Sequence, residues 1–437
     1  MREMKDSGMP WIGKIPKNWG TSPIKYICKP NSIKIGPFGS ALANKTFANE
    51  KYNVYGQANL VSGNFSATKN TVTKKTFNDL RNYEVLPDDI CVSMMGTIGK
   101  CRIVPLGIKQ GIMDSHLIKL RVKNEVILPE FFLYVYDKDL GGVCFKQMQY
   151  EKTGSIMDGL NTSIVKRLYV TLPPIKEQHR ITDYLDFKCA KIDSVRKNVE
   201  SEIEALKQYK QSVITEAVTK GLDKDVEMKD SGSQYWGEIP QSWNIVDIKY
   251  LFQIMKRIAG REGYDVLSIT QHGIKVRDVT IIKGQLANDY SNYQLLYPGE
   301  FAMNHMDLLT GWVDLSDKFG VTSPDYRVFR LRDTVHNSCR YYKYVMQVCY
   351  MCRIFYSLGS GVANLGRWRL QTPAFNNFKV PVPSYEEQEA IANYLDNKVA
   401  KIDSIIQNKQ ELLANLDTYK KSLIYEYVTG KKEVPAV

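Results

Sequence analysis

The sequence predicts an α/β protein of the α+β type, in which two mostly β domains are separated by two long antiparallel coiled-coil helices with an internal pseudo-two-fold. Three observations predict this fold. At 437 residues the chain is too long for one hydrophobic core. It contains two internal repeats. The second repeat has the composition and periodicity of a long helix.

The first repeat opens each half of the chain. The string MKDSG begins at Met4 and again at Met228, and Trp19 recurs as Trp243, 224 residues later. A Gly-x-Ile-Pro string precedes each tryptophan and Ile-Lys-Tyr follows it. The two halves therefore begin with the same structural plan.

The second repeat begins at Pro173 and at Pro383, so that its offset is 210 residues. Over it, 22 of 48 aligned positions are identical without a gap, against about one in twenty expected by chance. This identity establishes a duplication. Because the offset falls from 224 to 210, the variable segment is 14 residues shorter in the second half.

Each copy of the second repeat reads as a helix, because about 40 residues lack Pro and Gly and are rich in Glu, Lys, Leu and Ile. Ser384 followed by Glu387 has the spacing of a capping box. Apolar residues alternate at three and four positions, as in a heptad seam. The predicted helix-pairing residues are Ile192, Val195, Leu206, Val213, Ile402, Ile405, Leu412, Leu416 and Leu423. Leu412→Asp or Leu416→Asp is therefore expected to cost about 2 to 5 kcal/mol.

Helices about 60 Å long need a partner for their apolar stripe. The second variable segment leaves the end of one helix and enters the start of the other, which predicts antiparallel pairing within the chain. Because Val218–Gly221 and the following MKDSG resemble the chain's tail and head, the plan is nearly circular. A coiled coil that joins two chains is the alternative. The expected segments are two domains at 1–172 and 222–381 and two helices at 173–221 and 382–437.

The charge balance favours a polyanionic partner, because 59 Lys and Arg face 47 Asp and Glu, a net charge of +12. Nucleic acid is the first expectation and an anionic membrane the second. No run of about 18 apolar residues exists, and the first residues lack the apolar stretch of a signal peptide. The eight cysteines follow no disulfide framework. We expect a cytoplasmic protein that does not enter a membrane.

Several strings, in order and partly in duplicate, carry a resemblance to a known family. They are WIGKIPKNW (Trp11–Trp19), IGPFGS (Ile35–Ser40), LPDDICVSMMGTIGK (Leu86–Lys100), LPPIKEQHRITDYLD (Leu172–Asp186), YPGEFAMNHM (Tyr297–Met306), FGVTSPDYRVF (Phe319–Phe329) and VPSYEEQEAIANYLD (Val382–Asp396). With these motifs, over nearly its whole length, the chain resembles the specificity subunit of Type I restriction-modification systems.

The resemblance implies a protein that is not itself an enzyme. Its two target-recognition domains would each read one half of an asymmetric, bipartite double-stranded DNA site. The helices would hold two methyltransferase subunits for adenine N6 methylation and would set the half-site separation, on the order of 34 Å. Motor and restriction subunits would join the complex. S-adenosylmethionine, ATP and Mg²⁺ belong to these partners, and no cofactor is expected in this chain.

Within the expected recognition domains, glycine-rich turns and clusters of Lys, Arg, Thr and Asn are suited to phosphates and base edges. Turns onto a sheet and solvated charged faces are equally open interpretations of the same residues. The predicted DNA-binding residues are Gly36, Phe38, Ser40, Lys69, Lys74, Lys75, Arg81, Thr97, Lys100, Asn304, His305, Lys318 and Arg327.

Polar and aromatic residues recur at the start of both long helices. From their position alone, they are the predicted methyltransferase-binding residues: Glu177, Gln178, Tyr184, Glu387, Gln388 and Tyr394.

Catalytic readings of the chain lack their motifs. Pro173-Pro174 is the only Pro-Pro pair and does not follow the Asn or Asp of an adenine methyltransferase. Gly96–Lys100 is too short for a phosphate loop. Cys349 and Cys352 form a lone CxxC without a second ligand pair. The acid-x-Lys strings at Asp186 and Asp396 lie on the long helices and read as solvated faces. No catalytic or metal-binding residue is predicted. A coiled-coil scaffold that organises partner proteins without reading DNA is the alternative function.

Overall fold

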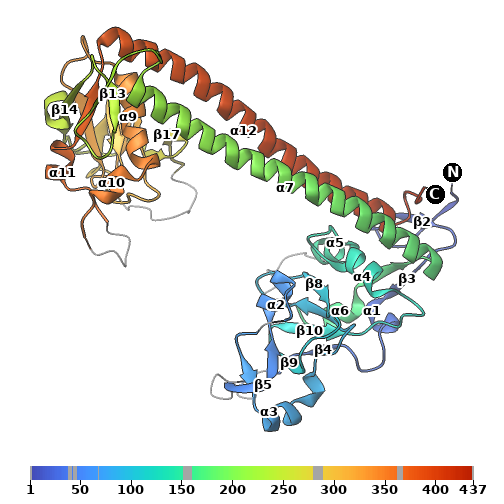
Figure 1. Cartoon of the computed structure of the whole chain (residues 1–437). Coiled ribbons are helices and arrows are strands. Elements are labelled where there is room, and N and C mark those ends of the chain that lie inside the picture. Colours follow the sequence, from blue (N-terminus) through green and yellow to red (C-terminus); the bar gives the residue numbers. More distant parts are fainter. Residues whose placement is uncertain are drawn as a thin grey trace. The chain divides into compact units, whose positions relative to one another are not determined.

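The computed structural model describes residues 2–37, 42, 47–66, 68–150, 160–278, 289–361 and 368–435, with the backbone alone at 47–51. The chain forms two compact units, Met1–Val199 with Glu411–Val437, and Glu200–Gln410. Helices α7 (Ile175–Lys220) and α12 (Tyr385–Val428) each give one half to each unit. In each unit the two helical segments run side by side (Figure 1).

The globular part of the first unit is built on an antiparallel sheet in the order β4-β10-β7-β8 and a second sheet, β6-β5-β9, in which β5 and β9 are parallel. The pairs β1-β2 and β11-β3 lie in the same unit. The strands are β1 (Met4–Asp6), β2 (Lys14–Pro16), β3 (Gly20–Pro23), β4 (Lys34–Ile35), β5 (Phe47–Tyr55), β6 (Thr71–Val72), β7 (Ile90–Ser93), β8 (Cys101–Ile103), β9 (Gly111–Met113), β10 (Leu117–Leu120) and β11 (Tyr169–Leu172). The short helices are α1 (Ile24–Ile27), α2 (Gln57–Ser62), α3 (Lys74–Asp79), η3 (Arg81–Tyr83), α4 (Pro129–Tyr136), α5 (Val143–Tyr150) and α6 (Thr162–Arg167).

The second unit repeats the four-stranded sheet as β15-β22-β19-β20 and adds the pairs β12-β13, β14-β23, β16-β17 and β18-β21. Its strands are β12 (Met228–Asp230), β13 (Glu238–Pro240), β14 (Asn244–Asp247), β15 (Phe252–Met255), β16 (Leu267–Thr270), β17 (Gly273–Val276), β18 (Gln294–Leu296), β19 (Phe301–Met303), β20 (Val313–Leu315), β21 (Gly320–Thr322), β22 (Arg327–Leu331) and β23 (Lys379–Val382). Its short helices are α8 (Ile248–Leu251), α9 (Cys339–Met351), α10 (Ile354–Ser357) and α11 (Thr372–Asn376). The α+β class with two long helices is confirmed.

Each unit has one main core, in which the start of one long helix packs with the end of the other. In the first unit Ile181 and Leu185 of α7 share the core with Ile424 and Val428 of α12. In the second unit Ile391 and Leu395 of α12 share it with Ile214 and Val218 of α7. The antiparallel pairing within the chain is therefore confirmed, and the same repeat positions make it in both units.

A repeated glutamine at the start of each long helix joins that helix to the globular part of its unit. The Oε1 atom of Gln178 accepts from the Leu128 amide (2.8 Å) at the start of α4, and its Nε2 donates to the carbonyls of Val126 and Pro173. Gln388 accepts from the Ser338 amide (2.8 Å) at the start of α9. Each glutamine thus satisfies an amide at a helix N-terminus that has no partner within its own helix.

Two further repeated contacts complete this connection, which we call the joint. The indole Nε1 of Trp19 donates to Glu177 (2.9 Å), and that of Trp243 donates to Glu387 (3.1 Å). About two turns further along, Asp186 accepts from the Tyr134 hydroxyl and Asp396 from the Tyr344 hydroxyl, both at 2.5 Å. Side chains of each long helix therefore hold two other elements in a fixed arrangement: the first repeat of the unit, and the helix α4 in the first unit or α9 in the second. The capping box is also confirmed, since Ser384 accepts from the Glu387 amide and Glu387 accepts from the Ser384 amide.

Ion pairs between the helices recur at equivalent positions. Lys420 pairs with Asp193 (2.6 Å) in the first unit, and Lys210 pairs with Asp403 (2.7 Å) in the second. Each of these residues lies 210 positions from its counterpart. The aliphatic stems of the lysines cover the apolar seam while their ammonium groups reach the carboxylates.

The seam does not follow the predicted frame at every position. Ile192, Val213, Ile402 and Leu423 are buried and Leu206 and Leu416 half-buried, as predicted, but Val195, Ile405 and Leu412 are exposed. The helices instead turn the following residues inward: Arg196, Ile203, Lys210, Ile406, Leu413 and Lys420. At these positions the seam follows the other alternation, in which the aliphatic stems of Arg196, Lys210 and Lys420 pack beside the apolar residues. A 3-4 and a 4-3 alternation share every seventh residue, so the shared positions agree in both frames.

The end of α12 lies against the start of the chain within the first unit, as the repeat of linker and tail predicts. Gly430 has a φ of +68°, and a Cβ there would lie 2.4 Å from Pro16. The Lys431 ammonium donates to the Ile12 carbonyl at 2.8 Å. Gly221 ends α7 with a φ of +75° beside Trp243 in the same way.

The corrected seam predicts that two leucines four residues apart differ in their effect. Leu416→Asp places a charge in the half-buried seam and should cost about 2 to 3 kcal/mol. Leu412→Asp changes an exposed position and should cost under about 0.5 kcal/mol. Chemical denaturation of both variants measures this, and equal losses would contradict the observed frame.

The joint predicts that removing the side-chain amide of Gln388 lowers the free energy of unfolding. Gln388→Ala leaves the buried Ser338 amide without an acceptor and should lower the free energy of unfolding by about 1 to 3 kcal/mol. Gln208→Ala, at an exposed position of α7 in the same unit, is the matched control and should change it by less than about 0.5 kcal/mol. If Gln388→Ala behaved like the control, the joint would not stabilise the unit.

Asp396 makes part of this stability depend on pH. Burial alone would raise the pKa of Asp396, but hydrogen bonds from Tyr344 and Arg340 and the charge of Lys343 hold it below its usual value. The stabilisation is therefore present above pH of about 4 and is lost as the pH falls through the lowered pKa. Because the carboxylate is about one-third exposed, Asp396→Asn should cost only about 1 kcal/mol at pH 7 and less at pH 3. Denaturation at both pH values measures the difference, and an equal loss would contradict the assignment.

Candidate nucleic-acid interface

Four of the predicted DNA-binding residues are cations on the surface of the first unit. Lys69, Lys74, Lys75 and Arg81 are exposed on and around α3, whose first turn carries no acidic residue. Thr73 caps this helix by accepting from the Thr76 amide (3.1 Å). The Nε atom of Arg81 lies 3.8 Å from a carboxylate oxygen of Glu84, and the arginine side chain is 71% exposed. This arrangement presents positive charge to solvent, as contact with phosphates requires.

Three other predicted residues of the first unit are engaged within it. At Gly36 a Cβ would lie 1.7 Å from the Asp114 carbonyl, so the protein's own backbone requires this buried glycine. Thr97 accepts from Gln57 (3.0 Å) and donates to Ser93. Lys100 pairs with Asp139 at 2.9 Å and is 15% exposed. Phe38 and Ser40 lie outside the described residues.

In the second unit the structure brings together two of the predicted residues, His305 and Arg327, with Arg369. Burial, together with the charges of Arg327 and Arg369, lowers the pKa of His305 to about 4. Burial lowers the pKa of Arg327 to about 10. The side chain of Asn304 accepts from the Met306 amide (3.3 Å) and shapes the turn that holds His305.

Lys318, another predicted residue of this unit, is exposed. It pairs with the adjacent Asp317 (2.9 Å), an ion pair that water screens strongly. Sequence reasoning missed Arg369, because it follows a segment in which no repeat is visible.

The predicted methyltransferase-binding residues separate into two groups. Gln178 and Gln388 are fully buried and bonded to their own unit, so their side chains serve the joint and do not reach the surface. Glu177 and Glu387 accept from the two tryptophans. The repeated tyrosines remain at the surface.

Tyr394 is 41% exposed. Tyr184 is half-buried, with its ring centroid 4.7 Å from that of Tyr427.

Sequence reasoning also missed Tyr134 and Tyr344, which complete the joint. They too lie 210 residues apart, so the signal was present in a segment taken to be variable. The 14-residue difference between the halves therefore lies before α4 and α9.

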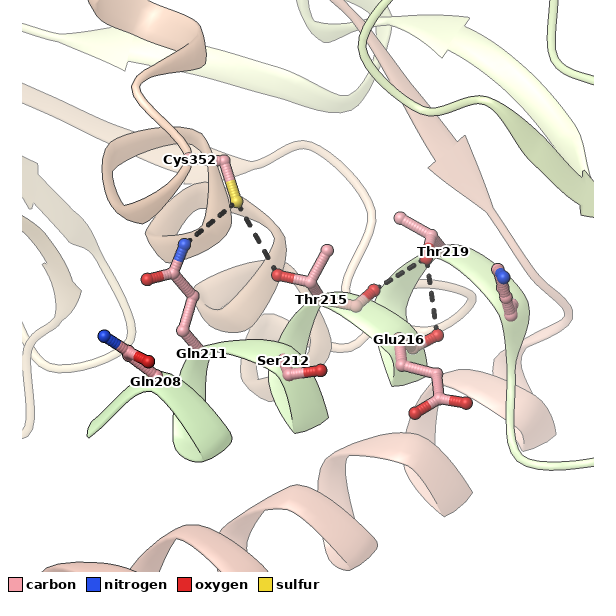
Figure 2. Close-up of a pocket in the computed structure, with 8 residues that line it drawn as sticks. Gln208, Gln211, Ser212, Thr215, Glu216, Thr219 and Cys352 are labelled. Atoms are coloured by element: carbon pink, nitrogen blue, oxygen red, sulfur yellow. Dashed lines mark hydrogen bonds between the residues drawn. The ribbon is translucent and has the colours of Figure 1, made fainter. Parts of the chain in front are cut away.

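A shallow hollow of about 550 Å³ lies along the end of α7 in the second unit (Figure 2). It is lined by Gln208, Gln211, Ser212, Thr215, Glu216, Thr219, Lys220 and Cys352. The sulfur of Cys352 lies 3.6 Å from Gln211 Nε2 and 3.7 Å from Thr215 Oγ1. Cys349 is buried on the preceding turn, and burial raises its pKa well above the usual value. The lining is mostly amides and hydroxyls, and it pairs no nucleophile with a base.

The described residues contain neither a metal-binding cluster nor a membrane-spanning helix. No three or more His, Cys, Asp and Glu side chains in these ranges lie where they would hold a metal ion. None of the helices in the described part is long and apolar enough to cross a membrane.

Comparison with known proteins connects this architecture to one family. The model of the Type I restriction modification DNA specificity domain matches residues 16–205 and 240–414, one match in each half. The chain is 23% identical over 373 residues to the Type I restriction enzyme MjaVIII specificity subunit of Methanocaldococcus jannaschii, which covers 82% of this chain and 83% of that protein. It is 23% identical over 394 residues to the EcoBI specificity subunit of Escherichia coli, with 83% of this chain and 77% of that protein covered.

Solved structures share the fold. A chain from a study of complex assembly and conformational transition of the type I R-M system aligns over 96% of this chain and 99% of its own length, with a TM-score of 0.69 at 14% identity. The HsdS subunit from Thermoanaerobacter tengcongensis aligns over 96% of this chain and 98% of its own, with a TM-score of 0.50 at 14% identity. The family model covers most of the chain and matches it twice, and the chain therefore belongs to the family of Type I restriction modification DNA specificity domains.

Proposed function

We propose that this chain is the specificity subunit of a Type I restriction-modification complex, which reads an asymmetric bipartite DNA target and positions methyltransferase subunits on it. One observation carries the proposal. The same joint occurs twice, yet the globular parts that it holds differ. The first unit has the β6-β5-β9 sheet, and the second has the β16-β17 and β18-β21 pairs instead. A duplicated support with two different reading surfaces suits two unlike half-sites.

The charge of the chain supports double-stranded DNA as the ligand. The net charge of +12 favours a polyanion. The exposed cations around α3 suit phosphate contacts, which place a protein on the duplex but carry no sequence information. Side chains at strand ends and turns then read base edges.

Exposed apolar residues repeated on the long helices suit a partner that binds twice. The first unit exposes Val195 and Tyr419, and the second exposes Ile405 and Tyr209 at the same repeat positions. Tyr184, which is half-buried, and Tyr394, which is exposed, form a third repeated pair. Because equivalent surfaces bind equivalent partners, two copies of one protein are expected, and in this family two methyltransferase subunits fit that description.

We assign the catalytic steps to other subunits. The methyltransferases would bind S-adenosylmethionine and methylate adenine N6 after flipping the base out of the duplex. A motor subunit would use ATP and Mg²⁺ for translocation and restriction. This chain then contributes DNA reading and assembly in the cytoplasm, without a cofactor of its own.

Mapping of N6-methyladenine tests the proposal directly. We expect a host that expresses this chain with its cognate methyltransferase to gain methylation at one asymmetric motif with a fixed internal gap. The methyltransferase alone should methylate no such motif. A stable complex that methylates no specific motif would instead favour the coiled-coil scaffold.

A paired substitution tests the docking surface. Val195→Asp with Ile405→Asp should reduce co-purification of the methyltransferase more than tenfold, because it places charge in both exposed apolar positions. Ala190→Asp with Ala400→Asp is the matched control: both alanines are exposed and lie five residues earlier, about 140° around the helix. Melting temperatures of all variants check the fold, and equal retention of the methyltransferase by both pairs would contradict this docking site.

A further inference from the structure

A buried arginine in the second unit lacks an acidic partner. Arg327 on β22 is 5% exposed. Its Nη2 donates to the Leu370 carbonyl (3.0 Å) and lies 3.3 Å from Thr372 Oγ1, and its guanidinium carbon lies 4.5 Å from the centroid of the Phe375 ring. Its Nη1 is buried and has no hydrogen-bond partner. Leaving a donor of a buried cation unpaired is costly unless another group completes it.

Two further basic side chains lie beside this arginine. The charges of Arg327 and Arg369 both act on His305, whose Nδ1 is also buried without a partner. The His305 carbonyl accepts from the Leu370 amide at 3.0 Å, which fixes the histidine next to the segment that carries Arg369. His305 and Arg369 are half-buried, so the cluster reaches the surface through them.

The neighbouring acidic groups do not neutralise the cluster. Tyr350 lies close enough to Arg327 to interact with its charge. Burial, however, holds the pKa of the Tyr350 hydroxyl well above the usual value, so this hydroxyl is neutral. The charge of Asp307 reaches Tyr350, yet this carboxylate accepts from the Leu309 and Thr310 amides and from the Thr310 hydroxyl.

Three other arginines on or next to the sheets of the described part are paired with acids. Arg102 pairs with Asp137, and Arg121 with Asp89. In the second unit Arg257, two residues after the end of β15, pairs with Glu300. Arg327 differs from them in having no such partner.

The first unit supplies an internal comparison for this cluster. In the ladder between β7 and β10, Ile118 lies opposite Val92, as Arg327 lies opposite Met303 between β19 and β22. Two residues after these strand positions, the Met94 carbonyl accepts from the Leu160 amide, as the His305 carbonyl accepts from that of Leu370.

The residues equivalent to Arg327 and His305 are therefore Ile118 and Met94, and both are buried in the main core of the first unit. This arrangement of strands is satisfied by apolar side chains. This arrangement of strands therefore does not itself require basic side chains at these two positions.

We propose that Arg327, Arg369 and His305 form a seat for one backbone phosphate of the DNA half-site read by the second unit. This inference rests on the proposed function and identifies a contact within it. A phosphate oxygen would accept from Arg327 Nη1, and its charge would balance the two guanidinium groups. Ile118 and Met94, at the equivalent described positions of the first unit, offer no such contact, so the two units would hold their half-sites differently.

Salt-dependent binding tests the seat. The complex with the methyltransferase is titrated with a duplex that carries the motif found by methylation mapping, at several salt concentrations. At a salt concentration of about 0.1 M, Arg327→Gln should weaken DNA binding about tenfold. It should also reduce the slope of log affinity against log salt concentration by about 0.9, the value for one phosphate contact. The methylated motif should not change, because a phosphate contact carries no sequence information. Arg330→Gln, which removes the same charge from an exposed position of β22, should leave affinity within about twofold.

Each other result has a distinct meaning. If the wild-type complex binds no motif, the proposed function fails. If the wild type binds and Arg327→Gln binds equally well with the same slope, the phosphate seat is overturned. Relaxed recognition at one base pair would assign the arginine to a base edge and would also overturn it.

Two controls separate the seat from a folding role and from a free anion. Arg327→Ile with His305→Met installs the residues of the first unit, and it should keep the wild-type melting temperature while losing the same affinity. A fall of more than about 5 °C with unchanged affinity would assign the cluster to folding. Inorganic phosphate at 10 mM, on the order of cellular levels, should raise the melting temperature of the wild type by less than about 1 °C. A larger rise that Arg327→Gln abolishes, with DNA affinity unchanged, would identify a free-anion site and overturn the proposal.

Discussion

The hydrogen bond that a backbone amide at a helix N-terminus donates to a buried glutamine is the constraint on which the rest of the structure depends. Gln178 and Gln388 lie on the long helices, while the amides that they accept from begin α4 and α9 in the globular parts. A buried amide without a partner is costly, so the helix and the globular part hold a single arrangement. The Trp-Glu and Tyr-Asp contacts then fix the remaining orientation. A reading surface supported in this way keeps its geometry on a rigid element, as recognition of a fixed DNA site requires.

The two joints are equal in plan but differ in charge. In the second unit Arg340 bonds to Asp396 (2.6 Å) and Lys343 lies 3.2 Å from the same carboxylate. Glu130 and Leu133 stand at the equivalent positions of the first unit, 210 residues earlier. The shared hydrogen bonds hold the architecture, and the charged additions are particular to one half. Duplication followed by divergence of everything beyond the joint accounts for this pattern.

The same divergence separates the two reading surfaces. The first unit pairs the arginines of its main sheet with carboxylates and presents exposed cations around α3. The second unit keeps Arg327 buried and His305 half-buried without acidic partners, where the first has isoleucine and methionine. Charge is therefore arranged differently on one backbone plan. This difference follows naturally if the two units bind unlike halves of one target.

The sequence by itself determined the duplication, the two long helices, their antiparallel pairing and the capping box at Ser384. Each depends on local composition or on identity between segments, which can be read along the chain. Only the tertiary structure decided which face of the helices forms the seam, because lysine and arginine stems pack there as apolar groups. Only the structure could show that Gln178 and Gln388 are buried and that Arg327 meets His305 and Arg369. These contacts join residues 22 to 50 positions apart, and burial of a polar side chain depends on the partners that folding brings to it.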